Sequence, residues 1–153
     1  KVNGNMEVVD KFQTFVKPTF YKILSPIVRK KTGITYKDIY SGCRFNTAIR
    51  NFKEWAGSDK YILYAWGSCD ILDLRRNCRC HHAKTNWLLH FVDLQKEFNE
   101  KYQLGKGVNY SLKNAMEFFD ISTDKKLHRA LVDAECTAEI FFKMNGLPGK
   151  REI

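Results

Sequence analysis

Residues 60–80, KYILYAWGSCDILDLRRNCRC, combine a short apolar strand, a turn and a helix. The first seven of these residues are aromatic or aliphatic enough for a strand covered on both faces of a sheet. The last ten place Ile71, Leu74 and Cys78 on one side of a helix. A strand that leads directly into a helix is typical of α/β proteins, so this stretch predicts an α/β domain.

Asp70 lies where this predicted strand ends and the helix begins. Open α/β sheets bind their ligands at the carboxyl ends of strands, which makes Asp70 a candidate site residue. The ordinary alternative is an aspartate in a first helical turn that is stabilised by the backbone amides. For Asp70 considered alone, that alternative is the better interpretation.

The chain on both sides of this stretch continues the same pattern. We expect a short helix over residues 26–31 that ends at Gly33, a helix over 42–55, a strand over 90–94 with a helix after it, and a helix that Ser111 caps. Turns are expected at Gly57-Ser58-Asp59 and Gly105-Lys106-Gly107. With no repeat and no linker, residues 1–153 are predicted to form a single domain with a mixed sheet flanked by helices.

Residues 125–144, KKLHRALVDAECTAEIFFKM, contain a histidine and an aspartate that could do chemistry together. The sequence from Arg129 onward predicts a helix with apolar positions at Ala130, Leu131, Ala134, Ala138, Phe141 and Phe142. His128 precedes this helix, and Asp133 follows five residues later. A helical aspartate can bind Mg²⁺ or Mn²⁺, and a nearby histidine can take a proton from a metal-bound water. For the pair alone, a carboxylate favoured by the helix dipole and a solvated ring remain the more common explanation.

The cysteine and histidine cluster of residues 78–82, CRCHH, suggests metal binding at first sight. Its ligands are too closely spaced for a closed zinc site, and no second Cys-x-x-Cys or His pair completes a tetrahedron. We therefore favour a helix end followed by a basic loop. The odd number of cysteines, five, favours reduced thiols and a cytoplasmic protein.

Charge and hydropathy limit the classes of partner. The formal net charge of +9 favours an anionic partner, and nucleic acid is the most common one, although a basic protein without such a partner fits as well. Neither a membrane-spanning run of apolar residues nor a signal peptide is present in these residues. The sequence does not indicate an oligomeric state.

Residues 1–17 predict a hairpin with its turn at Asn3-Gly4-Asn5, although only Lys1 and Val2 remain of the entering strand. The chain also begins without methionine. We therefore expect the first strand of the sheet to be missing from these residues.

Four pieces of sequence, in this order, resemble one family: FQTFVKP at 12–18, TGIT at 32–35, YAWGSCD at 64–70 and LHRALVDAECTAEIF at 127–141. They are similar to the DEDDh 3′→5′ exonucleases of the RNase T-like superfamily. The resemblance is strongest to the branch of the histone-mRNA exonucleases and the sporulation-inhibitor type. It covers essentially the whole chain and implies a ribonuclease-H-like fold.

The resemblance also implies roles for particular residues. Asp70 matches the aspartate of the second motif, which in this family helps to hold a metal ion, usually through water, and Asp133 matches that of the last motif, a direct metal ligand. His128 matches the general base that deprotonates the attacking water. The implied function is metal-dependent 3′→5′ exonucleolytic hydrolysis of single-stranded ends, with RNA as the expected substrate and nucleoside 5′-monophosphates as products. Two Mg²⁺ or Mn²⁺ ions would occupy the complete active site.

The departure from the family pattern is the Asp-x-Glu of the first strand. The single Asp-x-Glu in these residues, Asp133-Ala134-Glu135, already belongs to the last motif, while Glu7 and Asp10 lie on the returning hairpin strand. The N-terminal part has been lost, or the strand belongs to the molecule outside these 153 residues, or the protein is a degenerate member. Truncation is favoured over decay, because a member that lost only activity would keep the strand and change its acids. We expect these residues alone to be inactive, and the alternative function is an inactive nucleic-acid-binding or interaction module.

Overall fold

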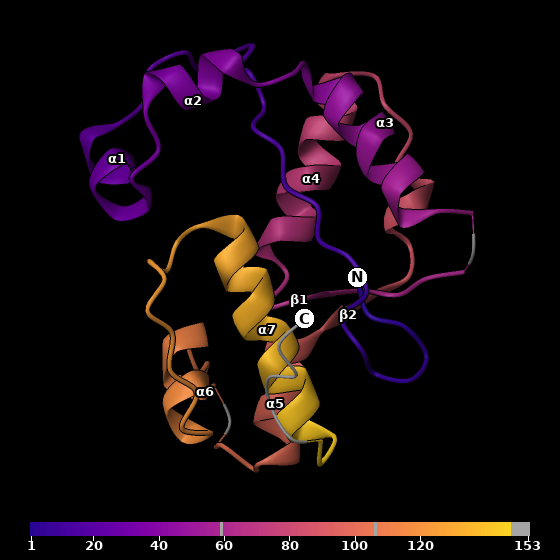
Figure 1. The fold of residues 1–153 in the computed structure, drawn as a ribbon, viewed down its shortest axis with the longest axis vertical. Helices are drawn as coiled ribbons and strands as arrows, with labels where there is room; N and C mark the ends of the chain where they lie inside the picture. Colours follow the sequence, from indigo (N-terminus) through magenta and orange to yellow (C-terminus); the bar gives the residue numbers. More distant parts are fainter. Residues whose placement is uncertain (59, 106, 148–153) are drawn as a thin grey trace. The chain divides into compact units, whose positions relative to one another are not determined.

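The computed structural model describes residues 1–58, 60–105 and 107–147 (Figure 1). The chain divides into two compact units: unit 1 comprises Lys1–Lys60 and Lys125–Val132, and unit 2 comprises Tyr61–Asp124 and Asp133–Ile153. Asp59 and Lys106, which the sequence predicts in turns, lie outside the described residues.

Unit 1 begins with the predicted hairpin. Val2 and Val8 form an antiparallel bridge, and the N–H of Asn3 donates to the carbonyl of Glu7 at 3.0 Å. The Oδ1 atom of Asn3 accepts hydrogen bonds from the N–H groups of Asn5 and Glu7, at 3.0 and 2.9 Å. The asparagine therefore stabilises the turn, as Asx turns do.

Three helices of unit 1 follow: α1 spans Pro26–Thr32, α2 spans Tyr36–Ser41 and α3 spans Phe45–Ala56. The prediction for α1 is confirmed, including Gly33 in the left-handed region with φ of 68°. Helix α2 was not predicted from the sequence, and it begins with a capping box between Thr35 and Asp38.

The predicted start of α3 at Gly42 is wrong by three residues. Gly42 and the next residue are extended because Cys43 pairs with Val16 in a parallel bridge. A Cβ atom at Gly42 would lie 2.4 Å from the carbonyl oxygen of Phe15, so this glycine permits the close approach of two backbones. A tertiary pairing thus overrides the local helical pattern.

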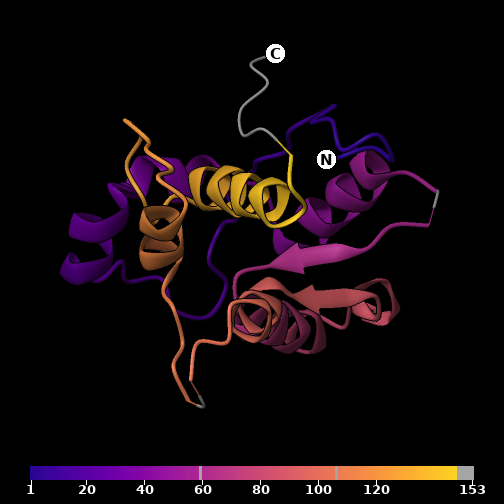
Figure 2. The same cartoon turned by 90° about the horizontal axis from the view of Figure 1, so that it is seen from below.

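Unit 2 contains a parallel pair of strands, β1 at Leu63–Ala65 and β2 at Phe91–Asp93, with Leu63 opposite Phe91 (Figure 2). Helix α4, Cys69–Cys80, and the short 3₁₀ helix η1, Asn86–Leu88, lie between them in the chain. The prediction of an α/β fold is confirmed. However, β1 is shorter than predicted, and Tyr64 is 42% exposed, so the expected coverage of both strand faces is wrong for this residue.

Phe98 forms the centre of the core of unit 2. It lies on α5, Leu94–Lys101, and is 0% exposed. The centroid of its ring lies 5.0–5.9 Å from the ring centroids of Trp66, Tyr102, Tyr110, Phe118 and Phe119. Trp66 also donates its indole N–H to the carbonyl of Tyr110 at 3.0 Å, so this tryptophan is a core residue with its polar atom satisfied.

Two further helices follow α5 in the chain. Helix α6, Leu112–Phe118, is capped as predicted, because Ser111 Oγ accepts from the N–H of Asn114 at 3.2 Å. Helix α7, Ala130–Met144, begins after His128. Its predicted apolar stripe is wrong at Ala130 and Ala134, which are exposed, and is confirmed at Phe142, which is buried. The buried residues are Cys136, Thr137, Ile140, Phe142 and Met144. The larger side chains bury more apolar area than the alanines do, and this favours the face that carries them.

Candidate active site

Asp70 occupies the first turn of α4, just beyond the end of β1. Its side chain is partly desolvated, and this raises the pKa of the carboxyl group above its ordinary value; repulsion from Asp133, and then from Asp73, raises it further. The direction is opposite to the one that helix amides would produce on an N-terminal carboxylate. Partial burial and the two neighbouring carboxylates therefore outweigh any stabilisation of the Asp70 charge by the helix amides.

Asp133 is the second carboxylate of the site and lies in the first turn of α7. It is half-buried, and its backbone carbonyl accepts a hydrogen bond from Thr137 Oγ at 2.7 Å. Asp70 and Asp133 are distant in the sequence, yet both belong to unit 2 and repel each other. Two like charges held close together favour a cation or a proton between them.

A stability measurement can check this repulsion. We expect Asp70→Asn to stabilise the protein slightly at pH 7 in EDTA, by less than about 1 kcal/mol, since solvent screens an exposed carboxylate. The pKa of Asp70 is raised in the folded state, so its ionised form costs stability above the folded pKa. The gain should therefore vanish as the pH falls towards about 4, where the unfolded aspartate also takes up its proton.

The measurement is thermal unfolding of the wild type and the variant between pH 4 and 7. Asp124→Asn removes the same charge from an exposed loop and is the control. A lower unfolding temperature for Asp70→Asn at pH 7 would contradict the repulsion.

His128 lies just before α7, in unit 1, with φ of 67°. This left-handed backbone is uncommon for a residue other than glycine. The neighbouring cations hold the segment to unit 1: Arg129 Nη1 donates to the carbonyl of Thr32 at 3.4 Å, and Lys126 Nζ donates to that of Lys30 at 2.9 Å. Asp70 and Asp133 belong to unit 2, so the position of His128 beside them stays a prediction.

The carboxylates fit a divalent metal ion in kind, but they do not complete its ligand set. Carboxylate oxygens are suitable ligands for Mg²⁺ and Mn²⁺. Within residues 1–58, 60–105 and 107–147, no group of three or more His, Cys, Asp or Glu side chains is arranged to hold a metal ion. Asp70 and Asp133 can therefore contribute to a metal centre that needs further donors.

The cysteine and histidine cluster at residues 78–82 belongs to the same described part of the chain and forms no such group either. Cys78 is buried, whereas Cys80 is exposed. All five cysteines are free thiols.

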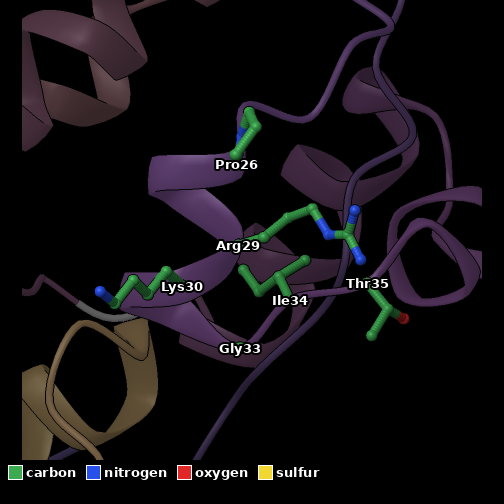
Figure 3. Close-up of a pocket in the computed structure, with 6 residues that line it drawn as sticks. All are labelled: Pro26, Arg29, Lys30, Gly33, Ile34 and Thr35. Carbon is green, nitrogen blue, oxygen red and sulfur yellow. The ribbon is translucent and has the colours of Figure 1, made fainter.

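A hollow of about 360 Å³ lies in unit 1 (Figure 3). It is lined by Pro26, Arg29, Lys30, Gly33, Ile34 and Thr35. This hollow was not predicted from the sequence, where the TGIT motif at 32–35 served only as part of a resemblance. The preceding basic run Arg29-Lys30-Lys31 was a signal that could have indicated an anion-binding surface here.

The α/β fold of the chain matches that of a family of nucleases. Residues 1–141 match the RNase T exonuclease family, and the chain belongs to this family. Its members generally use divalent metal ions.

Two relatives are similar to this chain over most of its length. The chain is 29% identical over 138 residues to the Probable 3′-5′ exonuclease KapD of Bacillus subtilis strain 168. It is 28% identical over 142 residues to DNA polymerase III PolC-type of Staphylococcus aureus. These matches cover 90% and 92% of this chain, but the chain spans only 66% of KapD and 9% of the polymerase.

Solved structures show the same fold at low sequence identity. The nuclease domain of 3′hExo, a DEDDh family member bound to rAMP, superimposes with a TM-score of 0.85 at 22% identity, over 99% of this chain and 82% of that one. A 3′-exonuclease solved for its 3′-end specific recognition of the histone mRNA stem-loop gives 0.82 at 23% identity, over 93% and 66%. The predicted ribonuclease-H-like fold is confirmed by these neighbours.

Proposed function

We propose that the protein is a metal-dependent 3′→5′ exonuclease that shortens single-stranded RNA and releases nucleoside 5′-monophosphates. The observation that carries the proposal is the position of Asp70, just beyond the end of β1 and near enough to Asp133 of α7 for this second carboxylate to raise its pKa. Partial burial and the neighbouring Asp133 raise the pKa of Asp70, and perturbed carboxylates of this kind are common at catalytic and metal sites. Membership of the exonuclease family supports the same reaction class.

The proposed roles follow from the chemistry of each side chain. Asp70 and Asp133 would hold Mg²⁺ or Mn²⁺, which would supply positive charge next to the scissile phosphate. His128 would take the proton from the attacking water. The water oxygen would then bond to phosphorus while the bond from phosphorus to the 3′ oxygen breaks. The 3′ oxygen of the shortened strand would take up a proton from solvent, and the terminal nucleotide would leave with its 5′ phosphate.

RNA is the proposed substrate because two structural neighbours were solved with RNA components. One neighbour was bound to rAMP, and the other recognises a histone mRNA stem-loop. The net charge of +9 is suited to a polyanion. None of the described helices is long and apolar enough to cross a membrane. Because the five cysteines are free thiols, which suit a reducing compartment, we propose a cytoplasmic location.

The test is a nuclease assay on 5′-labelled single-stranded RNA, with the protein expressed from its own gene and with this 153-residue chain alone. We expect Mg²⁺ or Mn²⁺ to produce a ladder that shortens from the 3′ end, and EDTA to stop it. The 153-residue chain should be much weaker, because Asp70 and Asp133 alone cannot hold two ions. Internal cleavage, or no cleavage by the protein from its own gene, would contradict the proposal.

A second candidate function is a non-catalytic nucleic-acid-binding module. It is favoured by the lack of a group of three metal ligands among the described residues. Such a module would bind RNA equally well with and without divalent metal and would leave the 3′ end intact. The same gel assay, run beside a binding measurement in EDTA, separates the two functions.

A further inference from the structure

Helix α2 of unit 1 (Figure 1) carries two tyrosines that are one helical turn apart in its sequence. The rings of Tyr36 and Tyr40 are stacked, with centroids 6.2 Å apart and planes inclined by 18°. Their residues are 38% and 43% exposed. Their spacing of four residues places both rings on one face of the helix. We name this pair the tyrosine platform.

A cation lies at each end of the tyrosine platform. Lys17 Nζ is 5.8 Å from the centroid of the Tyr40 ring, and the Arg29 guanidinium carbon is 5.8 Å from that of Tyr36. The N–H of Leu24 donates to Tyr36 Oη at 3.1 Å and restrains this ring. Each ring of the tyrosine platform therefore has one cation over it.

The acid on the same helix is already engaged. Asp38 accepts hydrogen bonds from the N–H and the hydroxyl of Thr35, both at 2.8 Å. These bonds lower the pKa of Asp38, mainly through the backbone N–H. The carboxylate therefore acts as part of the helix cap rather than as a partner of Lys17 or Arg29.

The excess of positive charge lies in unit 1, the unit that contains the tyrosine platform. Unit 1 contains 15 Lys and Arg residues against five Asp and Glu, a net charge of +10, whereas unit 2 has 11 against 12. Residues 11–37 contain seven basic residues and no acidic one. The same segment exposes Tyr21 by 91% and Ile23 by 86%. A polyanion that also carries flat apolar groups complements this surface in both charge and chemistry.

We propose that the tyrosine platform of α2 is a binding site for single-stranded nucleic acid, with bases stacked on Tyr36 and Tyr40 and phosphates paired with Lys17 and Arg29. The inference rests on the proposed function, because the bound strand would be the exonuclease substrate. A single strand exposes both its bases and its phosphates, and aromatic rings between cations match that alternation. An apolar protein partner would leave the excess of positive charge without a counterpart.

The experiment measures binding of a fluorescein-labelled oligouridylate of about 12 nucleotides to the full chain in EDTA, where hydrolysis does not interfere. We expect Tyr36→Leu/Tyr40→Leu to weaken binding at least about tenfold, and Tyr36→Phe/Tyr40→Phe to bind within twofold of the wild type. Both double variants remove the Tyr36 hydroxyl, so their difference reports the rings alone. Circular dichroism and thermal melting confirm that each variant is folded.

Charge variants give a second readout. Lys17→Gln/Arg29→Gln should lower the slope of log K against log salt by about 1.4, that is by about 0.7 for each phosphate that the variant no longer neutralises. Lys96→Gln/Lys113→Gln is the matched control, because these exposed lysines of unit 2 pair with Glu100 at 3.8 Å and Glu117 at 3.6 Å. The control should keep the slope of the wild type.

Three results of the binding measurements would overturn the inference: leucine variants that bind within twofold of the wild type, phenylalanine variants that bind as weakly as the leucine variants, or binding to anionic vesicles without binding to the oligonucleotide. The binding assay is independent of the nuclease assay. Ring-dependent binding without 3′ shortening would therefore support the tyrosine platform while it contradicts the proposed function. Shortening that is insensitive to the leucine substitutions would do the reverse.

Discussion

Asp133→Asn should abolish the metal-dependent 3′→5′ activity of the protein expressed from its own gene, with kcat/KM lowered at least about 10³-fold. The substitution is nearly isosteric, but it removes the negative charge of Asp133, which lies near enough to Asp70 to raise the pKa of that carboxyl group. A neutral amide compensates the charge of a divalent ion poorly, and several kcal/mol of transition-state stabilisation depend on that ion. The measurement is the initial rate of 3′ shortening of labelled single-stranded RNA.

Glu117→Gln is a suitable control, because it removes one negative charge from an exposed pair with Lys113 on α6. It should leave the rate within about twofold, as expected for a surface ion pair. A second readout is the rise in unfolding temperature on addition of Mn²⁺, which Asp133→Asn should lose along with the activity. Retention of more than a tenth of the wild-type rate by Asp133→Asn would reject its role as a metal ligand.

His128→Asn should lower kcat about 10²- to 10⁴-fold with little change in KM, since the proposed base acts on the water rather than on the RNA. Asparagine is the informative replacement because His128 has φ of 67°, and asparagine tolerates the left-handed region better than alanine does. The imidazole is then removed without added backbone strain. Steady-state kinetics on single-stranded RNA separate kcat from KM.

The chain offers a matched control for this substitution. His82 is also an exposed histidine with positive φ, 53°, so His82→Asn makes the same chemical change away from the proposed base. It should leave kcat within about twofold. If His128→Asn kept the wild-type kcat while Asp133→Asn lost activity, the results would support the metal site and reject the role of His128 as the base.

Asp70 and Asp133 were predicted as site residues from two different kinds of signal. Asp70 follows a strand and precedes a helix, and this position was readable from the local pattern. The assignment of Asp133 depended on the resemblance, because an aspartate in a first helical turn is common. The repulsion between the two could not be predicted locally, because they are 63 positions apart in the sequence and meet only through the packing of unit 2.

For the tyrosine platform, the sequence was enough to predict the helix and the spacing of the tyrosines but not the positions of the neighbouring cations. The capping box of Thr35 and Asp38 and the spacing of Tyr36 and Tyr40 were both visible in the sequence, so α2 could have been predicted. The positions of Lys17 and Arg29 at the ends of the platform were not, because one lies in an extended segment and the other on a separate helix. Contacts between segments that are separate in the sequence form only in the folded chain.

The sequence by itself determined the α/β class, the strand that leads to Asp70, the caps at Gly33 and Ser111, and the excess of positive charge. These features depend on neighbouring residues, on periodicity or on simple counts. Only the tertiary structure decided that α3 starts at Phe45, that α7 buries Cys136 and Ile140, and that Asp70 and Asp133 repel each other. The physical reason is that burial and electrostatics depend on which segments pack together, and that choice is made by long-range contacts rather than by local preference.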